Sequence, residues 1–278
     1  MSMNSFHARQ GGRSRDEKPT KAPVERHGLL RADALLVQNG QAASRTQAQR
    51  LISEGRVFCE GKAVTKPSLE LPADVILKVL EDESDRYVSR GALKLAGALR
   101  HTGVGATGKA CLDVGQSTGG FTDCLLQAGA RHVVGVDVGH GQLHAKLAAD
   151  SRVTAIEGIN CRALTAADLG DALPTGGFDL IVGDVSFISM ALILPQLLPL
   201  LAQNGEMLLL IKPQFEVGPT NIGKGGIVRN TALYRDVERK FADLARISGL
   251  TVADWLDSPI TGGDGNREFF IHLRLTTE

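Results

Sequence analysis

From about residue 108 onward the chain alternates short apolar runs with amphipathic helical segments, and this alternation is the strongest constraint on its fold. Several of the runs are almost continuously apolar, as strands covered by helices on both faces must be. Seven strands are predicted, at Cys111–Val114, Val133–Val138, Val153–Ile156, Phe178–Asp184, Glu206–Lys212, Val252–Ser258 and Phe269–Leu275. Strands that alternate with helices form parallel sheets. The sequence therefore predicts an α/β domain with a seven-stranded, mostly parallel sheet.

Charge is distributed unevenly along the chain, although the total cancels. Residues 1–66 carry twelve Lys/Arg and six Asp/Glu, a net charge of +6. The remaining residues carry nineteen and twenty-five, a net charge of −6. A basic amino-terminal part ahead of an acidic body is typical of a nucleic-acid-binding module joined to a second domain.

The sequence divides into four segments. Residues 1–27 carry six basic residues and few large apolar side chains, so we expect a disordered basic tail. Residues 28–80 are expected to form a small module, and residues 81–88 a polar linker. Residues 89–278 contain a helix and then the alternating domain.

The small module is predicted to combine two helices with short strands. The first helix begins near Arg31, and Ser44 with Gln47 forms a capping box for the second. The predicted strands are Val57–Cys59, Ala63–Val64 and Val75–Leu80. Basic side chains lie on both helices and near the strands, namely Arg31, Arg45, Arg50, Arg56 and Lys62. They are either a solvated basic face or a surface for phosphates.

A glycine-rich turn follows the first strand of the alternating domain, and an acid, Asp137, ends the second strand about twenty residues later. The glycines allow close approach of a ligand to the backbone, and such an acid accepts both hydroxyls of an adenosine ribose. No Walker lysine follows, and the turn departs from the dinucleotide fingerprint. Asp113 before the turn suits a cofactor with a positive amino group, which favours S-adenosylmethionine. The candidate cofactor residues are Asp113, Gly115, Ser117, Thr118, Gly119, Gly120, Phe121, Asp137 and Asn160. Asn160 either bonds the adenine or is an ordinary loop residue.

Charged residues occur where predicted strands begin or end. Asp184 and Lys212 end two strands, Glu268 starts the last one, and Lys94 lies in an apolar helical setting. Ligands of such sheets bind outside the carboxyl ends of the strands. Each residue alone has an ordinary explanation, as a solvated strand end or a lysine whose stem covers apolar surface. If the two lysines and two acids converge beside a methyl donor, the arrangement has a chemical meaning, because a lysine removed from water loses basicity and can act as a base near neutral pH.

Cysteine usage and hydropathy exclude several classes. Cys59, Cys111, Cys124 and Cys161 form no CxxC pair, which fits neither a zinc cluster nor a disulfide framework and favours reduced thiols. The most apolar stretch, 191–211, is interrupted by prolines and polar residues, so no membrane span is expected. The amino terminus has no apolar signal core, and a cytoplasmic location is expected.

Six motifs in combination resemble the TlyA-type rRNA methyltransferases, also called hemolysin A. They are Ser89-Arg-Gly-Ala-Leu-Lys94-Leu, Asp113-Val-Gly-Gln-Ser-Thr-Gly-Gly-Phe-Thr, Gly183-Asp-Val-Ser-Phe-Ile-Ser, Ile211-Lys-Pro-Gln-Phe-Glu, Gly223-Lys-Gly-Gly-Ile-Val-Arg and Asp264-Gly-Asn-Arg-Glu-Phe. The resemblance spans roughly residues 29–275. It implies an RNA-binding module of the ribosomal-protein S-four (alpha-L) type and an FtsJ-like, Rossmann-like methyltransferase domain that uses S-adenosylmethionine. One departure is Gln116, which stands where relatives carry a small residue.

The resemblance also implies a reaction, 2′-O-methylation of cytidine in small- or large-subunit ribosomal RNA. The family's Lys-Asp-Lys-Glu tetrad falls by motif on Lys94, Asp184, Lys212 and Glu268, with Lys212 as the base. The basic residues of the small module would then contact RNA phosphates. The segment Gly223–Arg229 is either a loop over RNA or a plain connection. No metal is needed, and which ribosomal subunits are modified stays open, as does the oligomeric state.

Three other functions compete with this one. A non-enzymatic RNA-binding ribosome-assembly factor would carry a vestigial methyl site, and the intact tetrad argues against it. A membrane-damaging hemolysin lacks support from any spanning segment. A base or small-molecule methyltransferase is disfavoured because the position of the usual Asn/Asp-Pro-Pro-aromatic motif reads Asp184-Val-Ser-Phe187.

Overall fold

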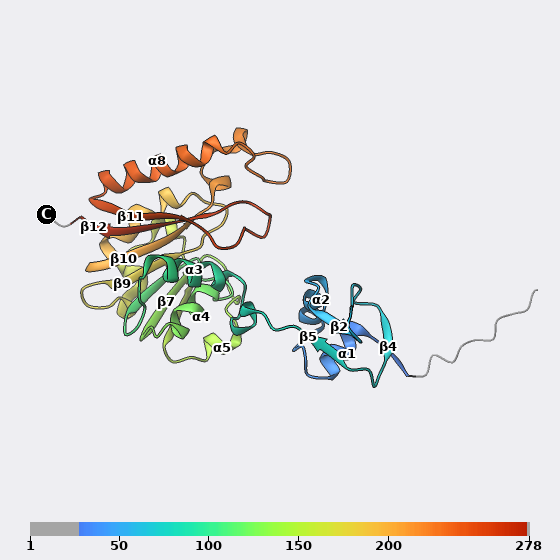
Figure 1. Ribbon diagram of the computed structural model, residues 1–278. Coiled ribbons are helices and arrows are strands. Elements are labelled where there is room, and N and C mark those ends of the chain that lie inside the picture. The colour runs from blue at the N-terminus through green and yellow to red at the C-terminus, as the bar shows by residue number, and fades with distance from the viewer. Residues whose placement is uncertain (1–27, 277–278) are drawn as a thin grey trace, which may run out of the picture. The chain divides into compact units, whose positions relative to one another are not determined.

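The computed structural model describes residues 28–276, apart from the side chain of Ser84. The predicted tail 1–27 lies outside the described residues. The chain divides into two compact units, and the boundary falls between Glu81 and Asp82 (Figure 1).

The amino-terminal unit packs two helices on short strands. Its helices are α1 (Ala32–Gln38) and α2 (Arg45–Ser53). Its strands are β1 (Leu29–Arg31), β2 (Val57–Cys59), β3 (Lys62–Ala63), β4 (Glu70–Pro72) and β5 (Leu77–Val79). β1 pairs with β4, and the other three form an antiparallel sheet in the order β3-β2-β5. The Ser44 hydroxyl accepts from the Gln47 amide, as predicted, whereas the Gln47 side chain accepts from the Ala43 amide rather than closing a box on Ser44.

The carboxy-terminal unit is built on a seven-stranded, mostly parallel sheet, which confirms the predicted fold class. Its strands are β6 (Ala110–Val114), β7 (His132–Asp137), β8 (Val153–Glu157), β9 (Phe178–Gly183), β10 (Leu201–Ile211), β11 (Leu250–Asp257) and β12 (Phe269–Leu275). The order is β11-β12-β10-β9-β6-β7-β8, and β12 runs antiparallel to both of its neighbours. The chain proceeds from β6 to β8 on one side and from β9 onward on the other. The reversal between β6 and β9 is where sheets of this kind bind ligands.

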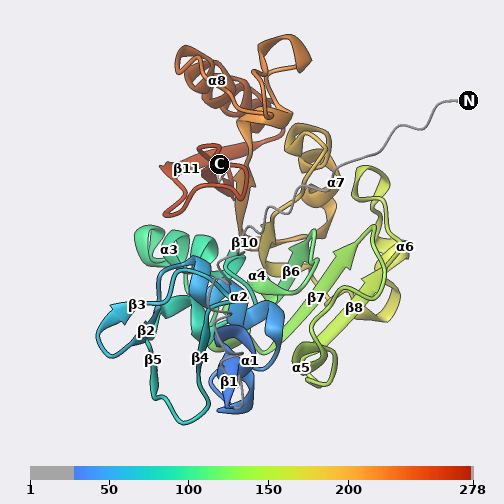
Figure 2. The ribbon, with the colours of Figure 1, turned by 90° about the vertical axis from the view of Figure 1, so that its right-hand side faces the viewer.

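Helices cover both faces of this sheet. They are α3 (Gly91–Thr102), α4 (Gly120–Gln127), α5 (Ala145–Ala148), α6 (Ala166–Leu169), α7 (Leu194–Leu197) and α8 (Ala232–Ile247). Short 3-10 turns lie at Glu83–Arg86, Cys161–Ala163, Gly170–Ala172, Met190–Leu192, Leu198–Leu200, Pro213–Phe215 and Pro219–Asn221. Successive residues of β9 alternate between the faces: Leu180 belongs to the core under α3 and α4, and Ile181 to the core under α7 and α8. Figure 2 shows β11 between α8 and α3.

The segment predicted as a linker is attached to the carboxy-terminal unit. The Val88 amide donates to Asp123 Oδ2 at 2.8 Å, and Arg100 pairs with Glu83 at 3.1 Å. The Gln127 side chain donates to the Arg86 carbonyl at 2.7 Å. These bonds fix the segment on α3 and α4, and they therefore also fix the chain that leads into α3, the helix that carries Lys94.

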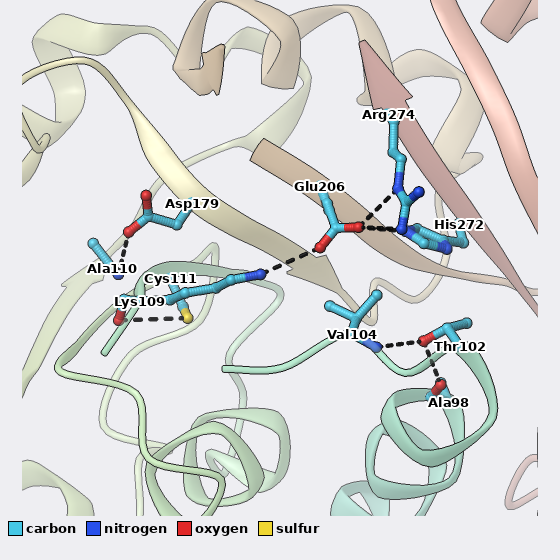
Figure 3. A network of polar contacts seen from close by, with 10 residues as sticks. All are labelled: Ala98, Thr102, Val104, Lys109, Ala110, Cys111, Asp179, Glu206, His272 and Arg274. Atoms are coloured by element: carbon cyan, nitrogen blue, oxygen red, sulfur yellow. Dashed lines mark hydrogen bonds and ion pairs between the residues drawn. The ribbon is translucent and has the colours of Figure 1, made fainter. Parts of the chain in front are cut away.

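A polar network joins the strands at the edge of the sheet opposite the carboxyl ends (Figure 3). Glu206 accepts from Lys109 at 3.2 Å and from Arg274 Nε at 2.8 Å, and His272 Nε2 lies 3.2 Å from its carboxylate. The Ala110 amide donates to Asp179 Oδ2 at 2.8 Å. Burial lowers the pKa of His272. These contacts fix the register of β6, β9, β10 and β12, and therefore the positions of the residues at their other ends.

Candidate functional site

Four ionisable side chains meet at the carboxyl edge of the sheet. Lys212 Nζ lies 2.6 Å from Asp184 Oδ1, and Lys94 Nζ lies 2.7 Å from Glu268 Oε2 and 3.8 Å from Asp184 Oδ2. The register explains the convergence, because Ile211 pairs with Phe269 and Leu209 with Gly183. The structure thus brings together all four residues of the predicted tetrad.

Burial sets the electrostatics of this cluster. Lys94 and Lys212 are each 9 % exposed and Glu268 is 3 % exposed. Burial raises the pKa of Glu268, and the hydrogen bond from Lys94 opposes the rise. Two buried ammonium groups and two carboxylates balance in charge, so neither sign is left uncompensated in a low-dielectric place.

Ser186 and Phe187 follow Asp184 and have roles that the sequence reasoning missed. Lys212 Nζ donates to the Ser186 hydroxyl at 2.8 Å, which gives the ammonium a second fixed partner. Phe187 is 92 % exposed, has φ +65°, and its ring centroid lies 5.5 Å from that of Phe215. An exposed aromatic side chain held in a left-handed backbone conformation is costly, and such positions concentrate at functional sites. Both residues belong to the motif around Asp184, but no rule based on residue spacing predicts their contacts from the sequence.

The glycine turn after β6 lies against the same edge. The Ser117 amide donates to Asp137 Oδ2 at 2.8 Å, and the Gly139 amide donates to Oδ1 at 2.7 Å. A Cβ at Gly115 would lie 2.6 Å from the Asp184 carbonyl oxygen, so this turn requires glycine to pass so close to the end of β9. The turn, β7 and β9 are therefore fixed to one another around Asp137.

A cavity of about 510 Å³ opens over this turn. It is lined by Gly115, Ser117, Asp137, Val138, Gln142, Asn160, Cys161, Asp184, Val185, Ser186, Phe187, Ile188 and Ile193. Carboxylate and amide groups beside apolar walls are what an adenosine requires. Asn160 Oδ1 accepts from the Arg162 amide, so one end of its amide group fixes the local turn.

Two smaller spaces continue from that cavity toward and beyond Lys212. A cavity of about 150 Å³ lies between the glycine turn and Lys212, and Gly120 and Phe121 contribute to it. A cavity of about 490 Å³ lies on the other side and is lined by residues that include Lys94, Phe187, Phe215, Ile222, Gly225, Gly226 and Glu268. Lys212 and Ser186 line both the cavity of about 150 Å³ and the cavity of about 490 Å³.

Three predicted cofactor residues, Asp113, Thr118 and Gly119, do not line these cavities. Asp113 is fully buried, accepts from the Thr122 hydroxyl at 2.7 Å, and burial raises the pKa of its carboxyl to about 7. Gly119 packs against Leu147, and Thr118 is exposed away from these cavities. A side chain at the end of a buried strand points either into the core or into the cleft, and Asp113 points into the core.

Gln116 also points inward. Its side chain is 5 % exposed and donates to Thr122 Oγ1 at 2.9 Å. It occupies the space beside Gly135, where a Cβ would lie 2.0 Å from the Gln116 amide. Gln116, Thr122 and Asp113 thus form a buried chain of hydrogen bonds beneath the turn, which supports its shape from below.

In the amino-terminal unit, Asp33 gathers two of the predicted RNA-binding arginines. The buried carboxylate accepts from Arg31 at 3.1 Å and from Arg45 at 2.9 Å, and the Gln49 amide adds a third bond at 2.9 Å. These bonds hold the pKa of Asp33 well below its usual range. Both arginine side chains remain about half exposed, at 45 % and 57 %. Their guanidinium groups are therefore fixed and still accessible.

The other three basic candidates differ from one another. Lys62 is exposed on β3, and Arg50 lies 3.9 Å from Glu54 on the same helix. Arg56 differs most, since its side chain is 9 % exposed and donates twice to the Leu80 carbonyl, at 2.6 and 3.0 Å. These two hydrogen bonds join Arg56 to the residue that follows β5, so its side chain stabilises the amino-terminal unit.

The cysteines are free, with Cys111, Cys124 and Cys161 buried and Cys59 half-buried, as the sequence predicts. Within residues 28–276 no group of three His, Cys, Asp or Glu side chains has the arrangement of a metal site. Over the same residues, none of the helices has the length and hydropathy needed to cross a bilayer.

The carboxy-terminal unit has the architecture of a Rossmann-like methyltransferase domain, and comparison with known proteins agrees. Residues 87–275 match the FtsJ-like methyltransferase family, and residues 30–76 match the S4 domain, as predicted for the small module. TlyA of Mycobacterium tuberculosis, a 16S/23S rRNA (cytidine-2′-O)-methyltransferase, is 42 % identical over 89 % of this chain and 91 % of its own length. Hemolysin A of Brachyspira hyodysenteriae is 37 % identical over 88 % and 99 %.

A solved structure agrees with these relatives. The structure described as "Putative hemolysin from Streptococcus thermophilus" is 39 % identical and superposes with a TM-score of 0.69, covering 90 % of each chain. The chain belongs to the FtsJ-like methyltransferase family, in the group that contains TlyA.

Proposed function

We propose that the chain transfers a methyl group from S-adenosylmethionine to the ribose 2′-hydroxyl of a cytidine in ribosomal RNA. The observation that carries this proposal is the position of Lys212, which lines both the space beside the glycine turn and the outer cavity. A base between donor and acceptor is what an in-line transfer to a hydroxyl requires.

The residues around the larger cavity fit the cofactor. The Asp137 carboxylate, fixed by two backbone amides, suits a ribose diol, and Asn160 with apolar Val138 and Ile193 suits an adenine. The space of about 150 Å³ beside the turn, lined by Gly115, Ser117 and Gly120, suits the amino-acid part. When bound, S-adenosylmethionine supplies an electrophilic methyl group on a sulfonium.

The tetrad residues have distinct roles in the proposed step. Lys212, once its ammonium has released a proton to solvent, accepts the proton of the attacking 2′-hydroxyl. Bound S-adenosylmethionine would supply the methyl group to that oxygen, and the carbon–sulfur bond would break to leave the thioether. Asp184, 2.6 Å away, stabilises the resulting ammonium, and the proton then leaves to solvent. Lys94, held by Glu268 at 2.7 Å, fixes the second oxygen of Asp184 and balances the carboxylates. Positioning and electrostatics supply the acceleration.

The outer cavity suits an unstacked nucleotide. Enzymes that act on a base-paired or stacked nucleotide turn it out into a pocket, and aromatic rings hold the base there. Phe187, exposed and braced by Phe215, offers such a ring beside Lys212. The half-exposed Arg31 and Arg45, with Arg50 and Lys62, supply phosphate contacts in the amino-terminal unit, whose role we assign to residues 28–80. The reaction belongs in the compartment of the ribosomes, the cytoplasm.

The test is methyl transfer from labelled S-adenosylmethionine to ribosomal subunits that lack the modification, with Lys212→Ala in parallel. We expect label on a cytidine ribose and its loss in the variant, while the variant still binds the cofactor. Label on a base would contradict the proposed chemistry. Cofactor binding without label on either subunit or on whole ribosomes would favour an assembly factor instead.

A further inference from the structure

A fourth cavity, of about 680 Å³, lies between the start of α8 and the strands β11 and β12. Three aromatic side chains line it, namely Tyr234, Trp255 and Phe269. Aromatic residues are 4 % of this chain, so three in one cavity are a local concentration. The Trp255 and Phe269 rings stack at 5.4 Å, and Tyr234 meets Phe269 edge-on at 5.4 Å. The tetrad and the proposed cofactor residues do not contribute to this lining.

Arg267 lies over this aromatic cluster. Its guanidinium carbon lies 5.0 Å from the centre of the Phe269 ring and 5.7 Å from that of Tyr234. Two hydrogen bonds to Asp257, at 2.6 and 2.8 Å, fix its orientation. The side chain is nevertheless 52 % exposed. The result is a planar, cationic surface that is already ordered and open to a ligand, so little entropy is lost when a flat ring stacks on it.

Two further charges enter the cavity from α8. Arg235 and Glu238 lie three residues apart, on one face of the helix. Neither side chain forms an ion pair or hydrogen bond among the residues that the structure describes, and both line the cavity. The cavity therefore offers a stacking plane, a free cation and a free hydrogen-bond acceptor. A nucleotide has the three matching parts, namely a flat base, a phosphate and, in most bases, an exocyclic amino group.

The cavity opens at the same edge of the sheet as the tetrad. Phe269 pairs with Ile211 on one side and with Asp257 on the other, so Lys212 and Asp257 flank the start of β12. The two lie about two strand spacings apart, or about 10 Å. Figure 1 shows the loop before α8 and the loop between β11 and β12 leaving the sheet at one edge. The Tyr234 hydroxyl donates to the Val228 carbonyl at 2.9 Å, which ties the cavity to the segment that lines the outer cavity.

We propose that this cavity binds one unpaired nucleotide of the RNA that lies next to the methylated one in sequence. Its base stacks on the guanidinium of Arg267, its phosphate pairs with Arg235, and Glu238 accepts from its amino group. The inference rests on the proposed function, because it assigns a second subsite to the same RNA. It also gives Arg267 a role separate from that of its neighbour Glu268, which pairs with Lys94 of α3.

Trp255 is the single tryptophan of the chain, so its fluorescence reports on this cavity directly. We would titrate the full chain with cytidine 5′-monophosphate and with a short oligocytidine. Saturable quenching is expected, weakened about tenfold by Arg267→Lys, which keeps the charge but removes the stacking plane, and about as much by Arg235→Ala. Arg246→Ala, at the other end of α8, is the matched control and should bind as the parent does. Absence of quenching, or equal affinity in all variants, would overturn the inference.

Methyl transfer to ribosomal subunits separates this inference from the proposed function. If both are right, Arg267→Lys and Arg235→Ala raise the KM for RNA about tenfold while the KM for the cofactor and the single-turnover rate at saturating RNA stay unchanged. Normal methylation with an unchanged KM for RNA would reject the subsite and leave the proposed function intact. If the parent chain methylates no ribosomal RNA, the proposed function fails, and quenching alone then decides whether the cavity is a nucleotide site.

Discussion

The Ser189 hydroxyl donates to Glu216 Oε2 at 2.6 Å, and this bond joins the segments that follow β9 and β10. Glu216 Oε1 accepts from the Met190 amide at 2.8 Å, and Lys240 of α8 lies 2.7 Å from Oε2. The Glu216 side chain is 1 % exposed. Since Asp184 directly follows β9 and Lys212 directly follows β10, this buried carboxylate holds the two halves of the Lys212–Asp184 pair at a fixed separation.

Glu216→Gln is therefore expected to slow methyl transfer without weakening cofactor binding. The amide replaces one of two acceptor oxygens with a donor, so either the Met190 amide or the Ser189 hydroxyl loses its partner. A buried donor left unpaired costs about 1–3 kcal/mol, and we expect kcat to fall about tenfold with an unchanged KM for the cofactor. Steady-state kinetics and urea unfolding measure the two effects.

Lys240→Met is the matched control for that variant. It removes the charge on α8 but leaves both hydrogen bonds between the segments, and the Lys240 side chain is 42 % exposed. We expect kcat close to that of the parent. A variant at Lys240 as slow as Glu216→Gln would show that the contact with α8, rather than the bond between the two segments, is what matters.

Asp33 makes the amino-terminal unit sensitive to acid. Its pKa is lower in the folded chain than in the unfolded one because Arg31, Gln49 and Arg45 bond the charged form. The resulting stability is complete above the unfolded value of about 4 and is lost as the pH falls below it. Asp33→Asn should therefore destabilise this unit at pH 7 and differ little from the parent in strong acid. Hydrogen exchange of the α1 and α2 amides in the full chain tests this, and a difference that is the same at both pH values would contradict it.

The pKa of Asp113 is shifted in the opposite direction to that of Asp33. Burial raises its pKa to about 7, so between about pH 4 and pH 7 the folded chain holds a proton that the unfolded chain has released. Its contribution to stability therefore falls as the pH rises through this window and is level above it. Three pKa units correspond to about 4 kcal/mol as an upper bound.

Asp113→Asn removes that titration, and its amide oxygen still accepts from Thr122. We expect its stability relative to the parent to rise between pH 5 and pH 8, as measured by urea unfolding followed through Trp255, which lies in the same unit. Parallel pH profiles of the two chains would show that Asp113 is ionised in the folded state throughout.

The sequence predicts more of the fold than of the site. Apolar runs such as 178–184 locate the strands because a strand covered on both faces has nowhere to place polar side chains. Strands β1 and β4 were missed, since three residues each leave no periodic signal. Three tetrad residues could be found because they lie next to strand ends, and Lys94 because its helical setting is apolar and its motif resembles that of the family. Glu216 was missed although its motif was noted, because its partners are 26 and 27 residues away in sequence and no spacing rule joins them.

Arg56 and Lys62 test the difference between a basic residue that builds the module and one that contacts RNA. Lys62 is exposed, so Lys62→Ala should weaken RNA binding for all sequences alike and reduce the slope of log affinity against log salt by about 1. Arg56→Ala leaves the Leu80 carbonyl without its buried donors, so it should destabilise the amino-terminal unit by about 1–3 kcal/mol and leave the salt slope unchanged where the chain is folded. Binding titrations over a salt series, with hydrogen exchange as the measure of folding, separate the two. A folded Arg56→Ala chain with a reduced slope would mean that its guanidinium reaches the RNA despite its burial.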